Sequence, residues 1–233
     1  MTYILGSRCK DGVVLIADRK FTIEQEGGFL YDDKLSAEIA HVIIGFAGSR
    51  GVFELFKAYL LHKIITYNNE NYDKDEKSKG MPSHKLIVEI SEIMSTLERK
   101  HYDRFDAMIA FGNPNGNASL KYFLNDGRIE TISQYKSIGT GLLHGKFFLN
   151  QLWDSEKTMR EIAEIGYFII KYIERFNLDY SVGVGQDKPQ VWFIPDKSSI
   201  DYQLSGHELE QLDKKTDSKL KEIDRFTKDL IKM

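Results

Sequence analysis

Strand-like and helix-like segments of this chain come in blocks rather than in strict alternation. Short runs rich in β-branched and aliphatic residues fill the first 48 residues, and apolar residues then recur at helical spacing in 52–67 and 85–100. Further strand-like runs lie between 104 and 139, and two more helices are predicted at 142–153 and 157–176. Blocks of this kind favour a layered α+β fold over a doubly wound parallel sheet.

The last quarter of the chain has two strand-like runs and then a charged helix. YSVGVG (180–185) and QVWFI (190–194) precede an amphipathic segment at 207–233. We expect residues 1–206 to form one domain, because 233 residues suffice for a single substantial core and no internal repeat is present. The C-terminal helix is expected to pack on that domain or on a neighbouring subunit.

The N-terminus reads as a β-hairpin. TYILGSRC (2–9) and VVLIADR (13–19) are separated by the turn-forming residues Lys10, Asp11 and Gly12. Thr2 directly follows Met1, so the sequence poses the question whether Thr2 is only a strand residue or a nucleophile uncovered by removal of Met1.

Composition and charge exclude several classes of protein. A net charge of −3 without a cluster of Lys and Arg argues against a nucleic-acid partner. The most apolar helical stretch, residues 165–173, contains Lys171 and is too short to span a bilayer, so no membrane partner is expected. Residues 1–10 lack the apolar run of a secretory signal. The single Cys9 cannot form an internal disulfide, which favours the cytoplasm.

Common catalytic motifs are also missing. The six histidines show no HxxxH spacing and one cysteine cannot build a zinc site, so we expect neither a metal nor a cofactor. The sequence has no G-x-S-x-G elbow, although a scattered Ser-His-Asp triad stays open. GTGLLHGKF (139–147) lacks the glycine and the Ser/Thr that a phosphate-binding loop needs.

Four residues have an ordinary interpretation when each is taken alone. Gly48 lies in a strand-to-helix turn, where small residues are common, although backbone N–H groups at such a junction can also bind an oxyanion. Asp18 ends an apolar strand and is typical of a salt-bridge partner. Lys34 follows two acids in what reads as a solvated loop, and Cys9 reads as a small core residue.

Taken together, these positions resemble the proteasome β-subunit family of N-terminal nucleophile hydrolases, which includes the bacterial HslV and Anbu proteins. The similarity lies in spacing as well as in residue type: T-x-x-[LV]-G from Thr2, then CKDGVVLIAD ending at Asp18, then Lys34 sixteen residues later. FAGS (46–49), RFDAMIAFG (104–112) and IGTG (138–141) also match the family pattern. The resemblance extends over about residues 2–194.

This resemblance implies a four-layer αββα sandwich, with two antiparallel sheets between helix pairs and an extra C-terminal helix. It implies cleavage of peptides or unfolded proteins through a threonyl ester, without a cofactor, in a homo-oligomer that can be a ring of six or seven. The implied catalytic residues are Thr2, Asp18, Lys34, Gly48, Thr140 and Asp179. The implied substrate-binding residues are Thr22, Phe46 and Arg50, with Phe46 making the pocket shallow and Arg50 favouring an acidic side chain.

The chemistry of an N-terminal threonine fits these residue types. A threonine hydroxyl is a poor nucleophile at neutral pH and needs a positioned base. Once Met1 is removed, the α-amine of Thr2, with a pKa of about 8 in model peptides, can take the hydroxyl proton directly or through water. A buried ammonium at Lys34, held by Asp18, lowers the pKa of that amine and hydroxyl. The Gly48 N–H can stabilise the oxyanion.

One stretch departs from the family pattern. The family has an Asp-x-x-Ser pair that orders water, and in RFNLDYSVGVG the aspartate matches Asp179 but the serine position falls on Val182, one place after Ser181. Thr140 replaces a family serine and keeps the hydroxyl. If water is misplaced, an amine resolves the acyl-enzyme, so a connectase-like protein ligase is one alternative. A catalytically silent assembly subunit is another, because a fold does not fix a function.

Overall fold

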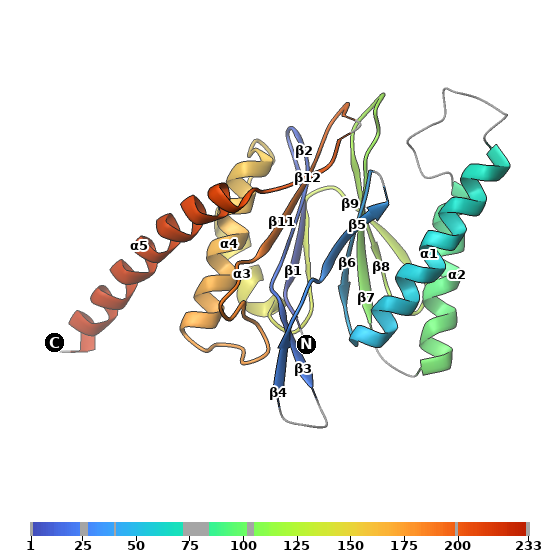
Figure 1. The fold of residues 1–233 in the computed structure, drawn as a ribbon. Helices are drawn as coiled ribbons and strands as arrows, with labels where there is room; N and C mark the ends of the chain where they lie inside the picture. The colour runs from blue at the N-terminus through green and yellow to red at the C-terminus, as the bar shows by residue number, and fades with distance from the viewer. Residues whose placement is uncertain are drawn as a thin grey trace.

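The helices and sheets of the protein stack in four layers (Figure 1). Two antiparallel sheets lie face to face in the middle. Helices α1 (Arg50–Asn71) and α2 (His84–His101) cover one sheet, and α3 (Leu142–Leu152) and α4 (Met159–Arg175) cover the other. The computed structural model describes residues 2–23, 28–39, 41–71, 84–101, 105–198 and 200–231. The four-layer αββα sandwich expected from the sequence is confirmed.

The sheet next to α3 and α4 carries the N-terminus. It has the order β10-β1-β2-β11-β12, and every neighbouring pair is antiparallel. Its strands are β1 (Ile4–Cys9), β2 (Gly12–Ala17), β10 (Tyr135–Ile138), β11 (Gln190–Pro195) and β12 (Tyr202–Gln203). β1 and β2 form the predicted N-terminal hairpin, with Cys9 opposite Gly12. Thr2 therefore lies at the open end of this hairpin, next to the residue that follows β2.

The second sheet has the order β5-β6-β7-β8-β9 and is also antiparallel. Its strands are β5 (Leu35–Ile39), β6 (Val42–Ala47), β7 (Asp106–Phe111), β8 (Ser119–Phe123) and β9 (Ile129–Ile132). A separate hairpin of β3 (Lys20–Ile23) and β4 (Gly28–Tyr31) projects from the end of the sandwich where the N-terminus lies (Figure 1).

Residues 29–36 (FLYDDKLS) are divided between two sheets. The first part of this stretch belongs to β4 and pairs with β3, whereas its last two residues open β5. The residues between them leave the ladder because the Lys34 side chain reaches Asp18 and its backbone N–H binds the side chain of Gln190. This break between β4 and β5 is what brings Lys34 to the end of β2.

Strand β2 shows how the two sheets share the core. All six of its residues are buried. Val14 and Ile16 pack in the cluster beneath α4, whereas Val13 and Leu15 pack in the cluster between the two sheets. Both faces of the strand are covered, so its sequence is a continuous apolar run rather than an alternating one.

The C-terminal helix α5 (Gly206–Ile231) lies along α4. Leu209 and Leu212 join the core beneath α4, and ion pairs join Arg160 to Glu208 near the start of α4 and Arg175 to Asp224 near its end. The helix therefore packs on its own domain over the length of α4. Across the part of the chain that the structure describes, no helix is long and apolar enough to cross a membrane.

The predicted strand YSVGVG is a loop. Residues 180–185 make no sheet ladder, because side chains accept the N–H groups that a strand would pair. Asp18 accepts from Gly183, and Glu174 accepts from Val184 and Gly185. The apolar residues still point inward, since Val182 and Val184 are buried in the core beneath α4, and this explains why the sequence resembles a strand.

Candidate active site

Thr2 is held at the open end of the β1–β2 hairpin. Its side chain is buried, and its Oγ1 donates to Oδ1 of Asp18 at 2.8 Å. Its carbonyl accepts from the N–H of Gly141 at 3.3 Å. Gly139, with φ of +91°, approaches so closely that an added Cβ would lie 2.1 Å from the carbonyl oxygen of Thr2. The glycines of the IGTG turn thus allow the turn to close over the backbone of Thr2.

The Asp18 carboxylate is the centre of the site. It is fully buried and accepts hydrogen bonds on both oxygens. Oδ1 accepts from Thr2 Oγ1, the N–H of Tyr3 and Lys34 Nζ, and Oδ2 accepts from the N–H groups of Lys20 and Gly183. A buried carboxylate is stable only with such partners, and this set brings together four segments of the chain.

Lys34 completes a buried ion pair with Asp18. Its side chain has no exposed surface, and Nζ lies 2.7 Å from Asp18 Oδ1 and 2.5 Å from the carbonyl oxygen of Lys20. Burial lowers the pKa of Lys34, and the Asp18 carboxylate opposes this by favouring the ammonium form. The structure brings Thr2, Asp18 and Lys34 together, and Lys34 does not lie in a solvated loop.

Gln190 fixes the backbone on either side of this ion pair. It lies in β11 opposite Ala17, the residue before Asp18. Its Oε1 accepts from the N–H groups of Lys34 at 2.7 Å and Leu35 at 3.0 Å, and its Nε2 donates to the Leu35 carbonyl at 3.3 Å. One buried amide therefore ties the end of β2 to the start of β5. The sequence analysis missed Gln190, although a polar residue at the start of an apolar strand was a signal.

A second chain of hydrogen bonds joins Thr140, Ser181 and Asp179. Thr140 Oγ1 lies 2.7 Å from Ser181 Oγ, which donates to Asp179 Oδ1 at 2.5 Å. Burial alone would raise the pKa of Asp179, but hydrogen bonds from Ser181 and Thr140 outweigh it and lower the pKa. The hydroxyl in this chain of bonds belongs to Ser181, whereas the neighbouring Val182 packs in the core beneath α4. A role of Ser181 in place of the family's serine stays a prediction.

The two groups of residues meet at Thr2. Thr140 lies between Gly139 and Gly141, which contact the backbone of Thr2. Ser181 lies two residues before Gly183, whose N–H binds Asp18. The same two connections, a turn and a loop, therefore place the hydroxyls of Thr140 and Ser181 beside the Thr2 network.

Gly48 and Phe46 lie at the end of β6. A Cβ on Gly48 would come within 2.6 Å of Phe105 Cβ, so only glycine fits. The Phe46 ring is 1% exposed and packs against Phe53, Phe56 and Phe105 in the core beneath α1 and α2. The roles of the Gly48 N–H as oxyanion donor and of Phe46 as pocket floor stay predictions.

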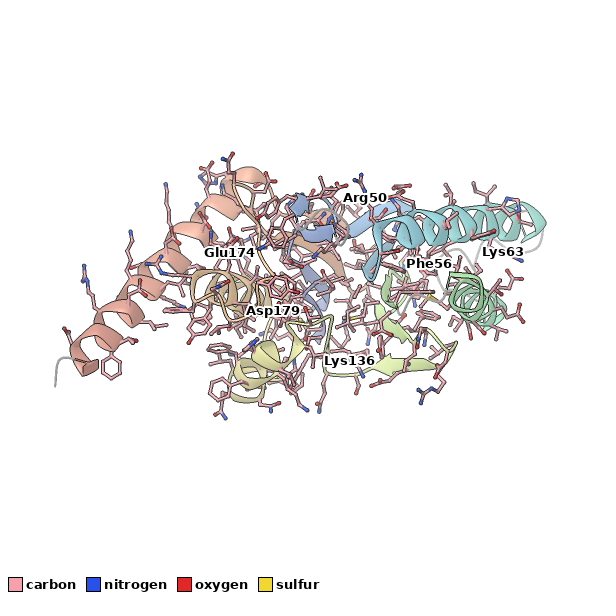
Figure 2. The ribbon with its side chains drawn as sticks, turned by 90° about the horizontal axis from the view of Figure 1, so that it is seen from below. Arg50, Phe56, Lys63, Lys136, Glu174 and Asp179 are labelled. Atoms are coloured by element: carbon pink, nitrogen blue, oxygen red, sulfur yellow. The ribbon has the colours of Figure 1, made fainter. Side chains whose placement is uncertain are left out.

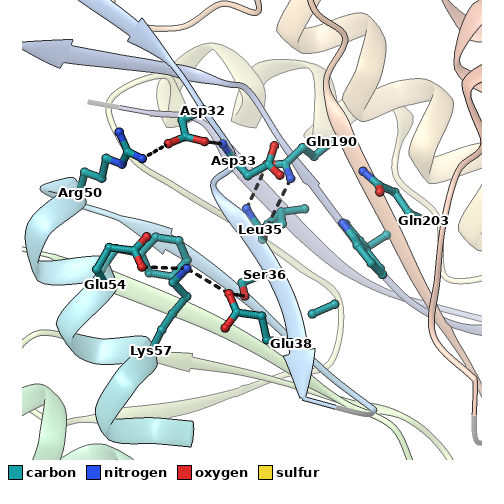
Figure 3. Close-up of a pocket in the computed structure, with 13 residues that line it drawn as sticks. Asp32, Asp33, Leu35, Ser36, Glu38, Arg50, Glu54, Lys57, Gln190 and Gln203 are labelled. Atoms are coloured by element: carbon teal, nitrogen blue, oxygen red, sulfur yellow. Dashed lines mark hydrogen bonds and ion pairs between the residues drawn. The ribbon is translucent and has the colours of Figure 1, made fainter.

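Arg50 lines a cleft of about 400 Å³ between β5, α1 and the β11–β12 pair (Figure 3). Its guanidinium lies 2.6 Å from Asp32, so the charge expected to attract an acidic substrate is already paired. Lys57, on the same wall, is paired with Glu38 and Glu54. Thr22 lies in β3 opposite Phe29, and its side chain lies outside what the structure describes. A substrate-binding role for Arg50 and Thr22 stays a prediction.

The site combines the buried hydroxyl of Thr2 with the buried ion pair of Asp18 and Lys34. Among the described residues, no group of three or more His, Cys, Asp or Glu side chains could hold a metal ion. Cys9 is buried and burial raises the pKa of its thiol to about 12, so it is not a reactive nucleophile at neutral pH.

Comparisons with known proteins agree with this geometry. The sequence pattern of the proteasome subunit family matches residues 2–179. No curated protein matches the sequence closely enough to count as a relative. An Anbu protein from Yersinia bercovieri, described as an ancestral beta-subunit, has a TM-score of 0.73 at 13% identity, covering 96% of this chain and 97% of that chain. An Anbu (Gly-1) mutant from Hyphomicrobium sp. strain MC1 gives the same score and identity over 97% of each chain. At such identity the two structures show similarity of fold alone.

Proposed function

The chain belongs to the proteasome subunit family, and on that premise we propose that it is a threonine peptidase whose nucleophile is Thr2 after removal of Met1. The observation that carries the proposal is the buried network in which Asp18 contacts both Thr2 Oγ1 and Lys34 Nζ. Buried, coupled ionisable groups beside a hydroxyl are typical of catalytic sites rather than of structural cores. While Met1 is attached, the Thr2 nitrogen is an amide and cannot act as a base.

The reaction proceeds in two steps. The free α-amine of Thr2 takes the proton from Oγ1, and Oγ1 attacks the carbonyl carbon of the substrate peptide bond. The Gly48 N–H stabilises the oxyanion, the C–N bond breaks, and the protonated α-amine returns the proton to the leaving amine. Water then attacks the threonyl ester and releases the acid and Thr2. Lys34 holds positive charge beside the nucleophile, and Asp18 orients Lys34.

Hydrolysis is favoured over acyl transfer by the position of Ser181. The ligase alternative depends on a misplaced serine. The Ser181 hydroxyl donates to Asp179 and is hydrogen-bonded to Thr140, which argues against that premise. A silent assembly subunit would behave the same after Thr2→Ala, so loss of cleavage in that variant separates it from a peptidase. Peptides or unfolded proteins are the proposed substrates, the cytoplasm is the proposed compartment, and a homo-oligomeric ring is the proposed assembly.

Peptide cleavage tests this proposal. The purified protein, with Met1 removed, is incubated with a mixture of unstructured peptides with and without an added amine, and the products are identified by mass spectrometry. We expect cleaved acids as the main products, and no cleavage by Thr2→Ala. Products joined to the added amine would favour the ligase, and cleavage that persists in Thr2→Ala would contradict the role of Thr2.

A further inference from the structure

Glu174 connects the end of α4 to the loop that carries Ser181. It lies in the last turn of α4 and is half-buried, and its Oε1 accepts hydrogen bonds from the N–H of Val184 at 2.8 Å and of Gly185 at 3.1 Å. Figure 2 shows Glu174 and Asp179 in the middle of the molecule, where α4 meets the strands of the N-terminal sheet. One carboxylate oxygen thus satisfies two consecutive backbone donors of a loop without a ladder.

The loop is held from two opposite sides at Gly183. Its N–H donates to Asp18 Oδ2 at 3.2 Å, and its carbonyl accepts from the N–H of Arg19 at 3.0 Å. On the other side, a Cβ on Gly183 would lie 2.7 Å from Oε1 of Glu174. Glycine is therefore the residue that lets the Glu174 carboxylate and the end of β2 approach the same peptide.

The contacts of this loop reach both hydrogen-bond networks of the site. Gly183 binds the carboxylate that contacts Thr2, and Ser181, two residues earlier, contacts Thr140 and Asp179. Among the loop's described hydrogen bonds, the pair to Glu174 is the one that ties residues 184 and 185 to a helix.

We propose that Glu174 is a positioning residue for acyl transfer at Thr2. It acts through the loop, because it fixes residues 181–185 so that the Ser181 hydroxyl and the Gly183 N–H reach their partners. The inference rests on the proposed peptidase function and assigns to that reaction a residue of α4 whose described side-chain hydrogen bonds go to the loop. An error of about 1 Å in the position of such groups can slow an enzyme by about 100-fold.

The acceptor oxygen, rather than the charge or the helix, is what the loop needs. Glu174→Gln keeps an oxygen at the same position, whereas Glu174→Ala removes it and leaves two loop N–H groups without their acceptor. Glu164→Ala is the matched control, because Glu164 lies on the same helix but pairs with Lys215 on α5. Gly183→Ala is a second way to separate the Glu174 oxygen from the loop N–H groups, since the added methyl displaces Oε1.

Covalent modification of Thr2 by a peptide epoxyketone separates positioning from folding. The rate of adduct formation at saturating probe and the half-saturating concentration are measured for each variant, below the onset of its thermal unfolding. For Glu174→Ala and Gly183→Ala we expect the maximal rate to fall by about tenfold or more, with half-saturation changed by less than about threefold. Glu174→Gln should stay within about threefold of the wild type, and Glu164→Ala should match it.

Two outcomes overturn the positioning role while leaving the peptidase intact. One is a wild-type rate in Glu174→Ala, and the other is equal slowing in Glu174→Gln and Glu174→Ala, since then the retained oxygen makes no difference. If Glu174→Ala does not fold, Gly183→Ala takes its place in the comparison. A wild-type rate in Gly183→Ala, or equal slowing in Gly183→Ala and Glu174→Gln, then overturns the positioning role. If the wild type itself forms no adduct, the proposed function fails, and the positioning role fails with it.

Discussion

The ammonium group of Lys34 lies 2.7 Å from the carboxylate of Asp18, and neither side chain has any exposed surface. Removing two charges from water is costly, and their attraction offsets this only where the geometry is close and the remaining donors and acceptors are used. Asp18 meets that condition by accepting from Thr2, Tyr3 and Gly183 as well. The pair therefore links the stability of the fold to the position of the Thr2 hydroxyl.

Removing the cation of this pair should damage both stability and reactivity. Lys34→Met leaves the Asp18 carboxylate buried without its counter-ion, so we expect a loss of about 3–5 kcal/mol in the free energy of unfolding. The rate of Thr2 acylation should fall by about 10²–10⁴-fold. Urea unfolding and the epoxyketone assay measure the two effects. Lys136→Met, which removes a more exposed pair with Glu130 at the same distance, should cost less than about 1 kcal/mol. Similar losses in both variants would contradict the account.

Removing the Gln190 amide should lower both the stability of the fold and the rate of Thr2 acylation. Gln190→Leu deprives the buried N–H groups of Lys34 and Leu35 of their acceptor, at about 1–3 kcal/mol for each group. The rate of Thr2 acylation should fall as well, because Lys34 is then less well placed against Asp18. Gln203→Leu is the matched control, since Gln203 lines the same cleft but is exposed. Chemical denaturation that gives equal stabilities for the two variants would refute a role for the Gln190 side chain.

The turn over Thr2 should tolerate no side chain at its first glycine. Gly139→Ala forces a residue with a Cβ into φ of +91° and drives that Cβ into the carbonyl of Thr2. We expect a loss of at least about 1–3 kcal/mol in the free energy of unfolding and loss of acylation. Gly51→Ala, in α1 with open space around the added methyl, should instead raise stability by about 0.5–1 kcal/mol. Thermal unfolding followed by circular dichroism compares them, and a stable, reactive Gly139→Ala would show that the turn does not hold Thr2.

The lowered pKa of Asp179 makes the free energy of unfolding depend on pH. The folded state holds Asp179 ionised below its ordinary value of 3.8, so the unfolded state binds more protons there. The stabilisation is complete above 3.8 and is lost as the pH falls through the folded pKa. The difference in unfolding free energy between the wild type and Asp179→Asn should therefore be constant above about pH 5 and shrink at lower pH. A difference that does not change as the pH falls below 3.8 would count against the Ser181–Asp179 bond.

The N-terminal part of the site could be predicted because it lies on continuous strands. In β1 and β2 each residue advances the chain by a fixed step, so the separation of Thr2 and Asp18 in sequence sets their meeting at the hairpin end. The blocks of strands and helices predicted a layered α+β fold, whereas the four-layer order followed from the family resemblance. Lys34 followed from the resemblance alone, since the sequence by itself reads as a solvated loop.

The remainder of the site depends on contacts between distant segments. The turn in which the Val182 N–H binds the Asp179 carbonyl directs Ser181 toward Thr140, and such a turn alters which residue of a motif faces the site. The side chains of Gln190 and Glu174 accept hydrogen bonds from backbone N–H groups of distant segments. Such contacts leave no pattern in the sequence around Gln190 or Glu174. The loop 180–185 was misread as a strand because its valines are buried, whereas its hydrogen bonds go to side chains.

The central claim is that Thr2 becomes the nucleophile once Met1 is removed, and intact mass spectrometry with a peptide epoxyketone tests it most directly. The account predicts that the purified protein lacks the mass of Met1 and gains one probe molecule, which peptide mapping places on Thr2. Thr2→Ala should gain none. A protein that keeps Met1 in the cell, or a probe that attaches elsewhere and equally to Thr2→Ala, would contradict it.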